Sequence, residues 1–328
     1  MNKSQWQDEH RGHQIGREAY LLDRERTPLE RARISSVTAR SLLVFSLLYV
    51  VGIGLIYGGI VGTGQQAGFQ LLPLVVLFAF LFEAFDSAAG MGFGTALAPT
   101  LFVLGYDPLQ IVPVLLLSEA ITGLTAGGIH HTFHNVRFSF SMNEATKLVA
   151  LFAGIGGLAT AGSVVLVYFA LQLPDELIRV YVAVLVVSMG VLGLARAKLH
   201  EPLGYRPRLL IVFALVAGMN KGIGGGGYGP VITLGQIVSG VFEKSATAIT
   251  ALSEGIVSVV GVVAFLALST QGVAVDPLLL PSIFTGGFLA AVTAPYIVSI
   301  VPNAVWQYAI PAYAVFVGVA ALVTGLNV

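Results

Sequence analysis

Five ionisable residues lie well inside long apolar stretches of the sequence: Glu83, Asp86, Glu119, Lys221 and Glu254. A charge at membrane depth is costly, so such residues by default mark a functional site. Lys221 is the only basic residue among the five, and it stands one residue before a string of glycines. We therefore expect Lys221 to supply a point charge to a small oxyanion.

Two dense glycine clusters accompany these charges, at residues 90–94 and 222–230. Glycine runs permit positive φ and expose backbone N–H groups, so at the start of a half-helix they form an anion site that the helix dipole reinforces. The residues that we expect to bind the substrate are Gly90, Gly92, Phe93, Gly94, Gly224, Gly225, Gly226, Gly227 and Tyr228. Tight helix packing also favours glycine, and it is the preferred interpretation for the glycines of 154–162, which have no charge nearby.

Glu119 and Glu254 each follow a Leu-Ser pair on the helix expected after a glycine cluster. A carboxyl group in lipid can be neutral in one state and ionised in another, which would suit proton coupling. The alternative is a structural role, in which a glutamate accepts hydrogen bonds from unwound backbone N–H groups. The hydroxyls of Ser118 and Ser253 could reach a ligand or could bond back within their own helices.

The sequence argues against several other kinds of chemistry. It has no cysteine, which rules out a thiolate metal site, an iron–sulfur cluster and a cysteine nucleophile. His130, His131 and His134 have a spacing that could bind a metal, but no nearby Cys or Asp completes the set, and we expect an interfacial cluster instead. No HExxH, Walker A, G-x-S-x-G or basic–aromatic nucleic-acid pattern occurs. We therefore expect no enzyme activity, cofactor, metal or nucleic-acid partner.

The elements that position these residues must lie in a membrane. Hydrophobic residues make up 56% of the chain and charged residues 10%, whereas about 25% of the residues of soluble domains are charged. Residues 1–40 hold eight of the 17 Lys and Arg and six of the 17 Asp and Glu. The first apolar run starts behind this charged tail, so we expect a retained first span and no cleaved signal peptide.

Nine apolar runs follow the tail, and seven of them have close to the roughly 20 residues that cross a bilayer as a helix. The runs are 41–61, 70–103, 109–129, 147–172, 178–196, 209–240, 245–270, 278–301 and 305–325. The runs 70–103 and 209–240 are longer, and they contain the glycine clusters. The sequence therefore predicts an all-α polytopic membrane protein with two split or re-entrant segments.

The two long runs repeat each other at a constant offset of 135 residues. The identical pairs are Gly90 and Gly225, Gly92 and Gly227, Gly94 and Gly229, Val103 and Val238, Gly105 and Gly240, Leu117 and Leu252, Ser118 and Ser253, Glu119 and Glu254, and Ile121 and Ile256. Identities beyond those expected by chance indicate an internal duplication. Asp86 corresponds to Lys221, and the alternative for these two residues is a structural pair that neutralises both charges.

Positive charges on the loops indicate how the two copies are oriented, since cytoplasmic loops are rich in Lys and Arg. If 70–103 enters the membrane and returns, the basic tail, Arg137 and the basic loop 196–208 all lie inside. The second copy is then inverted relative to the first, as in many secondary transporters. We expect seven full spans and two re-entrant pairs, arranged as a cytoplasmic tail (1–40), an extra helix (41–61) and repeats at 70–196 and 209–326.

The duplicated glycine segments continue into proline-containing apolar stretches, at Gly94–Pro99 and Tyr228–Pro230. In these segments, and over residues 70–326 as a whole, the chain resembles the sulfite exporter TauE/SafE family of membrane permeases. The resemblance implies transport of sulfite, organosulfonates or related sulfur-containing anions, mostly as export, across the bacterial inner membrane. The second cluster has four consecutive glycines where the first does not, so we expect the second half-site, with Lys221, to make most contacts.

Together these observations predict a secondary transporter that binds a small sulfur-containing anion between the two glycine breaks. Alternating access, coupled to protons or to the membrane potential, would release the anion. The alternatives are an anion channel and a non-transporting membrane sensor or assembly protein. The expected partners are the small anion and the lipid bilayer, and the sequence leaves a homodimer open.

Overall fold

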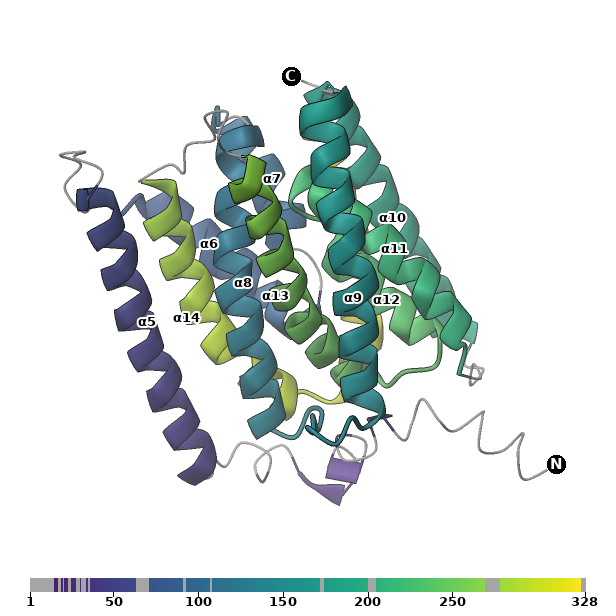
Figure 1. The fold of residues 1–328 in the computed structure, drawn as a ribbon. Helices are drawn as coiled ribbons and strands as arrows, with labels where there is room; N and C mark the ends of the chain where they lie inside the picture. The colour runs from purple at the N-terminus through teal and green to yellow at the C-terminus, as the bar shows by residue number, and fades with distance from the viewer. Residues whose placement is uncertain are drawn as a thin grey trace.

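The long helices of the chain stand side by side (Figure 1). The computed structural model describes residues 36–62, 71–90, 93–106, 108–171, 174–199, 205–268 and 278–325, with isolated positions between 15 and 34. Its elements are α5 (Ser36–Gly62), α6 (Pro73–Ala89), α7 (Phe93–Val103), α8 (Pro108–Thr132), α9 (Glu144–Val164), the π-helical segment η1 (Val165–Leu171), α10 (Asp175–Leu199), α11 (Pro207–Gly224), α12 (Tyr228–Val238), α13 (Glu243–Leu268), α14 (Leu279–Ile300) and α15 (Asn303–Gly325). Most of the predicted tail (1–40), and Gly92, lie outside the described residues.

Six helices in the described part of the chain are long and apolar enough to cross a membrane, namely α5, α8, α9, α11, α13 and α14. Five of them coincide with single spans predicted from the sequence, and α11 is the first part of the second long run. The two remaining predicted spans form α10 and α15, with described apolar stretches at 183–195 and 304–320. The predicted all-α polytopic architecture is therefore confirmed.

Both long apolar runs are broken at a glycine. Helix α6 is followed by Gly90 with a φ of 66°, and α11 by Gly225 with a φ of 69°. Glycine can adopt this left-handed conformation because it has no Cβ atom. A residue in this conformation ends an α-helix. The chain then starts again as two 11-residue half-helices, α7 and α12. The sequence thus encodes each break locally, through glycine.

The helix bounds follow the predicted offset of 135 residues. Helices α7, α8 and α9 start at residues 93, 108 and 144, and α12, α13 and α14 start 135 residues later, at 228, 243 and 279. The positive φ angles of Gly105 (92°) and Gly240 (89°) correspond in the same way. The backbone therefore supports the internal duplication, while the inverted orientation of the two copies stays a prediction.

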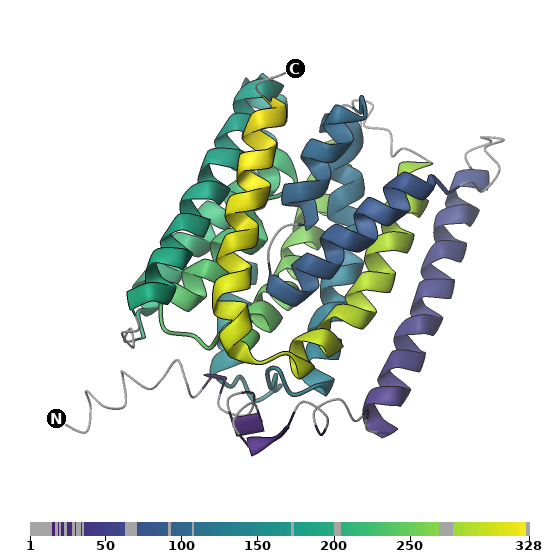
Figure 2. The same ribbon diagram turned by 180° about the vertical axis from the view of Figure 1, so that it is seen from behind.

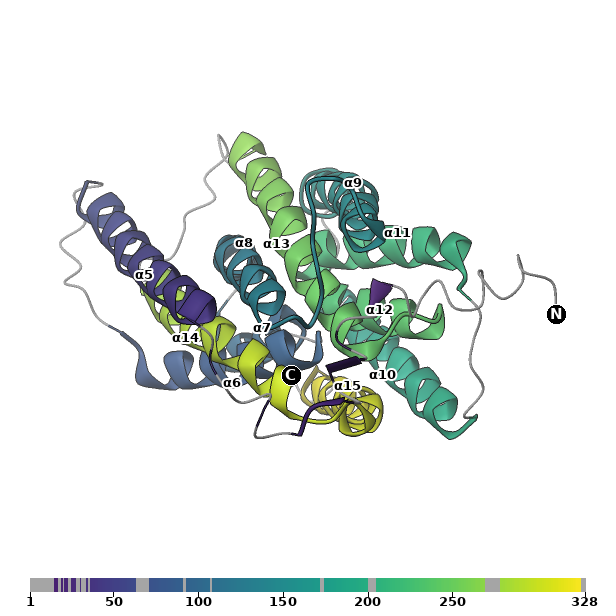
Figure 3. The ribbon, with the colours of Figure 1, turned by 90° about the horizontal axis from the view of Figure 1, so that it is seen from below.

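The first broken pair enters the bundle and turns back within it. In Figure 2, α6 runs from the end of the molecule where α5 terminates towards the centre, and α7 returns towards the same end. Helices α11 and α12 pack beside α9 and α13. Seen from below, α5 and α14 lie at one edge and α10 lies at the other (Figure 3). The loop 133–143 lies at the end where α5 starts (Figure 1).

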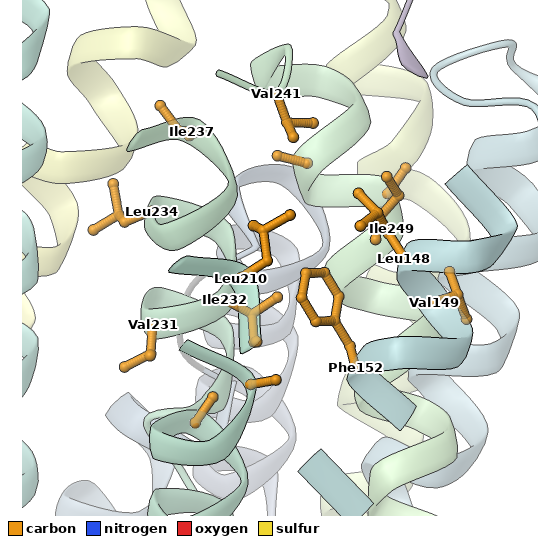
Figure 4. Packing of buried hydrophobic residues seen from close by; sticks show 14 of the residues in the cluster. Leu148, Val149, Phe152, Leu210, Val231, Ile232, Leu234, Ile237, Val241 and Ile249 are labelled. Atoms are coloured by element: carbon orange, nitrogen blue, oxygen red, sulfur yellow. The ribbon is translucent and has the colours of Figure 1, made fainter. Parts of the chain in front are cut away.

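In the described part of the chain, the largest cluster of buried hydrophobic residues lies around the second broken pair. Phe152 of α9, Leu210 of α11 and Ile232 of α12 are buried in one cluster that also includes residues of α13 (Figure 4). Helix α5, by contrast, has few buried residues. The Tyr49 ring of α5 stacks on Phe284 of α14, with the ring centroids 5.7 Å apart. The duplicated part therefore forms the packed body, and α5 lies at its periphery.

The glycines of α9 have different surroundings. A Cβ atom on Gly218 of α11 would lie 2.2 Å from the carbonyl oxygen of Gly156, so the two helices pack backbone against backbone. Gly157 faces a side chain of α13, 3.3 Å from the place of its missing Cβ. In the described part of the chain, no heavy atom of another element lies within 4 Å of the place that a Cβ atom on Gly154 or Gly162 would take. The predicted packing role is therefore confirmed for Gly156 and Gly157 and wrong for the other two.

Candidate functional site

The two glycine breaks touch each other through their backbones. A Cβ atom on Gly94 would lie 2.2 Å from the carbonyl oxygen of Gly225, and one on Gly226 would lie 2.5 Å from the carbonyl carbon of Gly94. Any larger residue would force the backbones apart, which explains the glycines. Gly224, the last residue of α11, is buried directly before this contact. The predicted binding glycines therefore converge, apart from Gly92, which lies outside the described residues.

Two hydrogen bonds join the breaks. Thr95 Oγ1 in α7 accepts the N–H of Gly227 at 2.7 Å, and Thr233 Oγ1 in α12 donates to the carbonyl of Gly90 at 2.7 Å. The N-terminal, electropositive ends of α7 and α12 therefore lie at the contact. The sequence analysis missed both threonines. Neither has a threonine at the corresponding position of the other copy, so the repeat gave no signal for them.

A buried ion cluster lies beside this contact. Lys221 of α11 is fully buried and donates hydrogen bonds to Oε2 of Glu119 on α8 and to Oε1 of Glu254 on α13, the second at 2.7 Å. The two glutamates occupy equivalent positions in the two copies, and both are buried. One lysine is thus shared by two carboxyl groups, and the cluster ties α8, α11 and α13 together.

Glu119 also caps the first half-helix. Its Oε1 accepts the N–H of Gly94 at 3.2 Å, one residue after the start of α7. A carboxylate in this place is stabilised both by the hydrogen bond and by the helix dipole. The structural role that we expected for one of the two glutamates is therefore present in Glu119. Its oxygen lies where an anion at the α7 N-terminus would bind.

Two further carboxyl groups at the site, those of Glu83 and Asp86, belong to α6 and are also buried. The salt bridges of Lys221 go to the two glutamates rather than to Asp86, so the alternative of a structural Asp86–Lys221 pair is not realised. Asp86 lies instead beside α12, because a Cβ atom on Gly229 would be 3.0 Å from its Oδ1. Glu83 accepts hydrogen bonds from a serine of α6 at 2.7 Å and from Thr122 Oγ1 at 3.3 Å. Both carboxyl groups thus have defined places in the packed interior.

The predicted serine and aromatic residues are buried near the breaks. Ser253 Oγ donates to the carbonyl of Thr250 at 3.0 Å, which is the back-bonding alternative, and accepts a hydrogen bond from Tyr228 at 3.2 Å. Ser118 Oγ is buried without a hydrogen-bond partner in the described part of the chain. Phe93 and Tyr228 are 1% and 0% exposed, so their rings are part of the core.

The histidines have a structural environment. His130 is fully buried; its Nε2 donates to the carbonyl of Ser87 at 2.9 Å and its Nδ1 accepts from Asn135 Nδ2 at 2.9 Å. The expected interfacial position is therefore wrong for His130, which links α8 to α6. His131 is exposed and accepts a hydrogen bond from the N–H of Phe138 at 3.0 Å. In the residues that the structure describes, no group of three His, Cys, Asp or Glu could hold a metal ion.

Asn220 is a site residue that the sequence analysis missed. Its side chain is fully buried, and its Cβ atom would lie 3.2 Å from a Cβ atom on Gly227. A signal was present in the sequence, because Asn220 is a polar residue inside an apolar run and directly precedes Lys221. The second break is therefore lined by an amide as well as by glycines.

Comparison with known proteins agrees with this architecture. The family model described as Sulfite exporter TauE/SafE matches residues 74–323. The chain belongs to the sulfite exporter TauE/SafE family. A relative described as "Probable membrane transporter protein YtnM", from Bacillus subtilis (strain 168), is 26% identical over 237 residues, which cover 68% of this chain and 74% of that protein. No solved structure matches the chain.

The TauE/SafE match spans both glycine breaks, both glutamates of the ion cluster and Lys221. It leaves α5 and the charged tail outside. The resemblance noted in the sequence is therefore confirmed. As a TauE/SafE member with several membrane-length helices, the protein is a multi-pass membrane protein of a transporter family.

Proposed function

We propose that this protein is a secondary transporter that exports small sulfur-containing anions, such as sulfite or organosulfonates, by alternating access. Family membership supports this class of substrate. The observation that carries the proposal is the contact between the two breaks, where α7 and α12 begin beside buried Lys221. Helix N-termini present backbone N–H groups and positive partial charge, which favour a bound anion.

The ion cluster gives this transporter a means of coupling to protons. An anion that binds Lys221 competes with its two carboxyl partners for the single positive charge and displaces one of them. Glu254 is the partner to be displaced, because Glu119 is held in addition by the N–H of Gly94. The displaced carboxylate takes up a proton, since an unpaired charge in the protein interior is costly. The proton and the anion would then be released to the same side.

The two copies provide the alternating access. In this proposal they are inverted repeats, and the pair α6–α7 and the pair α11–α12 open the site to opposite sides of the membrane in turn. The membrane is the bacterial inner membrane, and the tail with its eight Lys and Arg lies in the cytoplasm together with Arg137. The anion is released outside.

Counterflow in proteoliposomes tests the proposed function. Vesicles with the purified protein are loaded with unlabelled sulfite, sulfoacetate, taurine or thiosulfate, and uptake of the labelled anion is followed at several pH values. We expect the internal anion to accelerate uptake of the external one. Flux without such acceleration would indicate a channel, and binding without flux would indicate a sensor. If none of the four compounds is exchanged, the sulfur-anion proposal is wrong.

A further inference from the structure

The side-chain amide of Asn220 is left without hydrogen bonds by the fold. Its Oδ1 and Nδ2 are both buried, and neither has a hydrogen-bond partner in the described part of the chain. Among the described residues, the others that have a buried side-chain N or O atom without a hydrogen-bond partner have one such atom each, whereas Asn220 has two. A buried amide in this condition destabilises the protein, because it has lost water and gained no partner.

This amide lies at the start of the second half-helix. A Cβ atom on Gly227 would be 3.2 Å from Asn220 Cβ and 3.6 Å from Asn220 Nδ2. Gly227 has a φ of 78° and directly precedes α12, an 11-residue helix. The N-terminal turn of a helix favours an anion. An unpaired donor and a helix N-terminus are therefore adjacent at the second break.

Lys221, the neighbour of Asn220, already uses two of its three N–H donors. Its ammonium group already donates to Glu119 and to Glu254. An anion gains a hydrogen bond from the amide of Asn220 without breaking an existing one, whereas at Lys221 it competes with two carboxyl groups for one positive charge. The amide is therefore a contact that an anion can make without any exchange of partners.

We propose that Asn220 contacts the substrate directly, donating from Nδ2 to an oxygen of the anion and accepting at Oδ1 from a donor on the same ligand. This inference rests on the proposed transport function and narrows its substrate class. An amide that pairs both of its polar atoms with one ligand requires an acceptor and a donor on that ligand. The substrate is thus an oxyanion that carries a hydroxyl, an ammonium group or a proton of its own.

The charges around the breaks favour the same class of ligand. The carboxyl groups of Glu83, Asp86, Glu119 and Glu254 interact electrostatically with one another, and Lys221 is the basic partner among the groups that act on Asp86. Lys221 is the only basic residue among these five groups, so the second negative charge of a dianion would have no cation to pair with. A singly charged oxyanion with a hydrogen-bond donor meets both requirements, as in hydrogensulfite, hydroxyalkanesulfonates or aminoalkanesulfonates.

The test uses two sulfonates of equal charge and similar size, 2-hydroxyethanesulfonate with a donor and ethanesulfonate without one. Counterflow by the wild type should favour the hydroxyl compound by about tenfold, the contribution of one hydrogen bond. The Asn220→Leu variant should transport the hydroxyl compound at least about tenfold more slowly than the wild type does. It should also show no preference between the two sulfonates. Because this substitution removes an unpaired buried amide, the melting temperature of the Asn220→Leu variant should equal or exceed that of the wild type.

Ser239→Ala is the matched control, because Ser239 Oγ is also buried without a partner but lies at the opposite end of α12. This variant should transport like the wild type. Asn220→Asp, which keeps the shape and removes the donor, should also lose transport, and it serves as the second variant if Asn220→Leu does not fold. If either Asn220 variant transports both sulfonates at wild-type rates and keeps the preference for the hydroxyl compound, the inference about Asn220 is wrong. The proposed transport function is not affected by that result. Absence of any counterflow in the wild type overturns the proposed function and the inference with it.

Discussion

At the scale of single residues, Lys221 is a shared cation. Its type and place in the sequence predict a free charge beside the glycines, but the fold brings Glu119 and Glu254 to it from two other helices. Removal of one partner from a buried ion pair is strongly destabilising, because it leaves an uncompensated charge in the interior. The residue therefore has a structural contribution that can be measured separately from transport.

Lys221→Met should destabilise the protein strongly, because it leaves Glu119 and Glu254 buried without a cation. Breaking a buried ion pair costs about 3–5 kcal/mol. Thermal unfolding of the purified variant in nanodiscs measures this loss. Adding Glu119→Gln and Glu254→Gln should restore folding but not transport, since no unpaired charge is left. Arg137→Ala, in an exposed loop position, is the control and should leave both stability and transport unchanged. Wild-type stability in Lys221→Met would contradict the role of the cluster.

Glu254→Gln should flatten the pH dependence of counterflow more than Glu119→Gln does. The reason is the additional hydrogen bond from Gly94 that holds Glu119 in place, so that Glu254 is the carboxyl partner that an anion can displace from Lys221. Transport rates of both variants and the wild type over a pH series provide the measurement. Unchanged profiles in both variants would remove the glutamates as proton carriers, and a larger effect of Glu119→Gln would reverse their roles.

At the scale of elements, the half-helices depend on backbone contact. Gly226→Ala places a methyl group 2.5 Å from the carbonyl carbon of Gly94, so the two breaks must separate. We expect this variant to lose most counterflow activity and to unfold at a lower temperature. Gly162→Ala in α9 is the matched control, because among the described residues no heavy atom of another element lies within 4 Å of the new methyl group. It should keep activity and gain up to about 1 kcal/mol from helix propensity. Equal effects of the two substitutions would show that the contact is not required.

At the scale of the whole molecule, the topology can be tested without background, because the chain has no cysteine. Ser141→Cys lies in the exposed loop between α8 and α9, and Pro174→Cys lies in an exposed position between η1 and α10. Since one helix crossing separates them, they should face opposite sides. A membrane-impermeant thiol reagent should label Pro174→Cys in intact cells and Ser141→Cys only after permeabilisation. The reverse pattern would place the tail outside.

The sequence by itself determined the helices and their breaks. Apolar length sets where a helix can cross lipid, and glycine sets where it can end, and both are local properties of the chain. For this reason the starts of α7 and α12, at Phe93 and Tyr228, lie within the two glycine clusters that predicted the breaks. The repeated Glu119 and Glu254 were found in the same way, from an identity at a fixed offset.

Only the tertiary structure decided which buried groups meet. Lys221 and Glu119 are 102 residues apart in the chain, and their pairing depends on which faces of α8 and α11 pack together. Asp86, which the sequence offered as the alternative partner of Lys221, lies beside α12 instead. The unpaired amide of Asn220 likewise became visible only when its neighbours were known. Hydrogen bonding between distant helices is a non-local property, so spacing in the sequence cannot specify it.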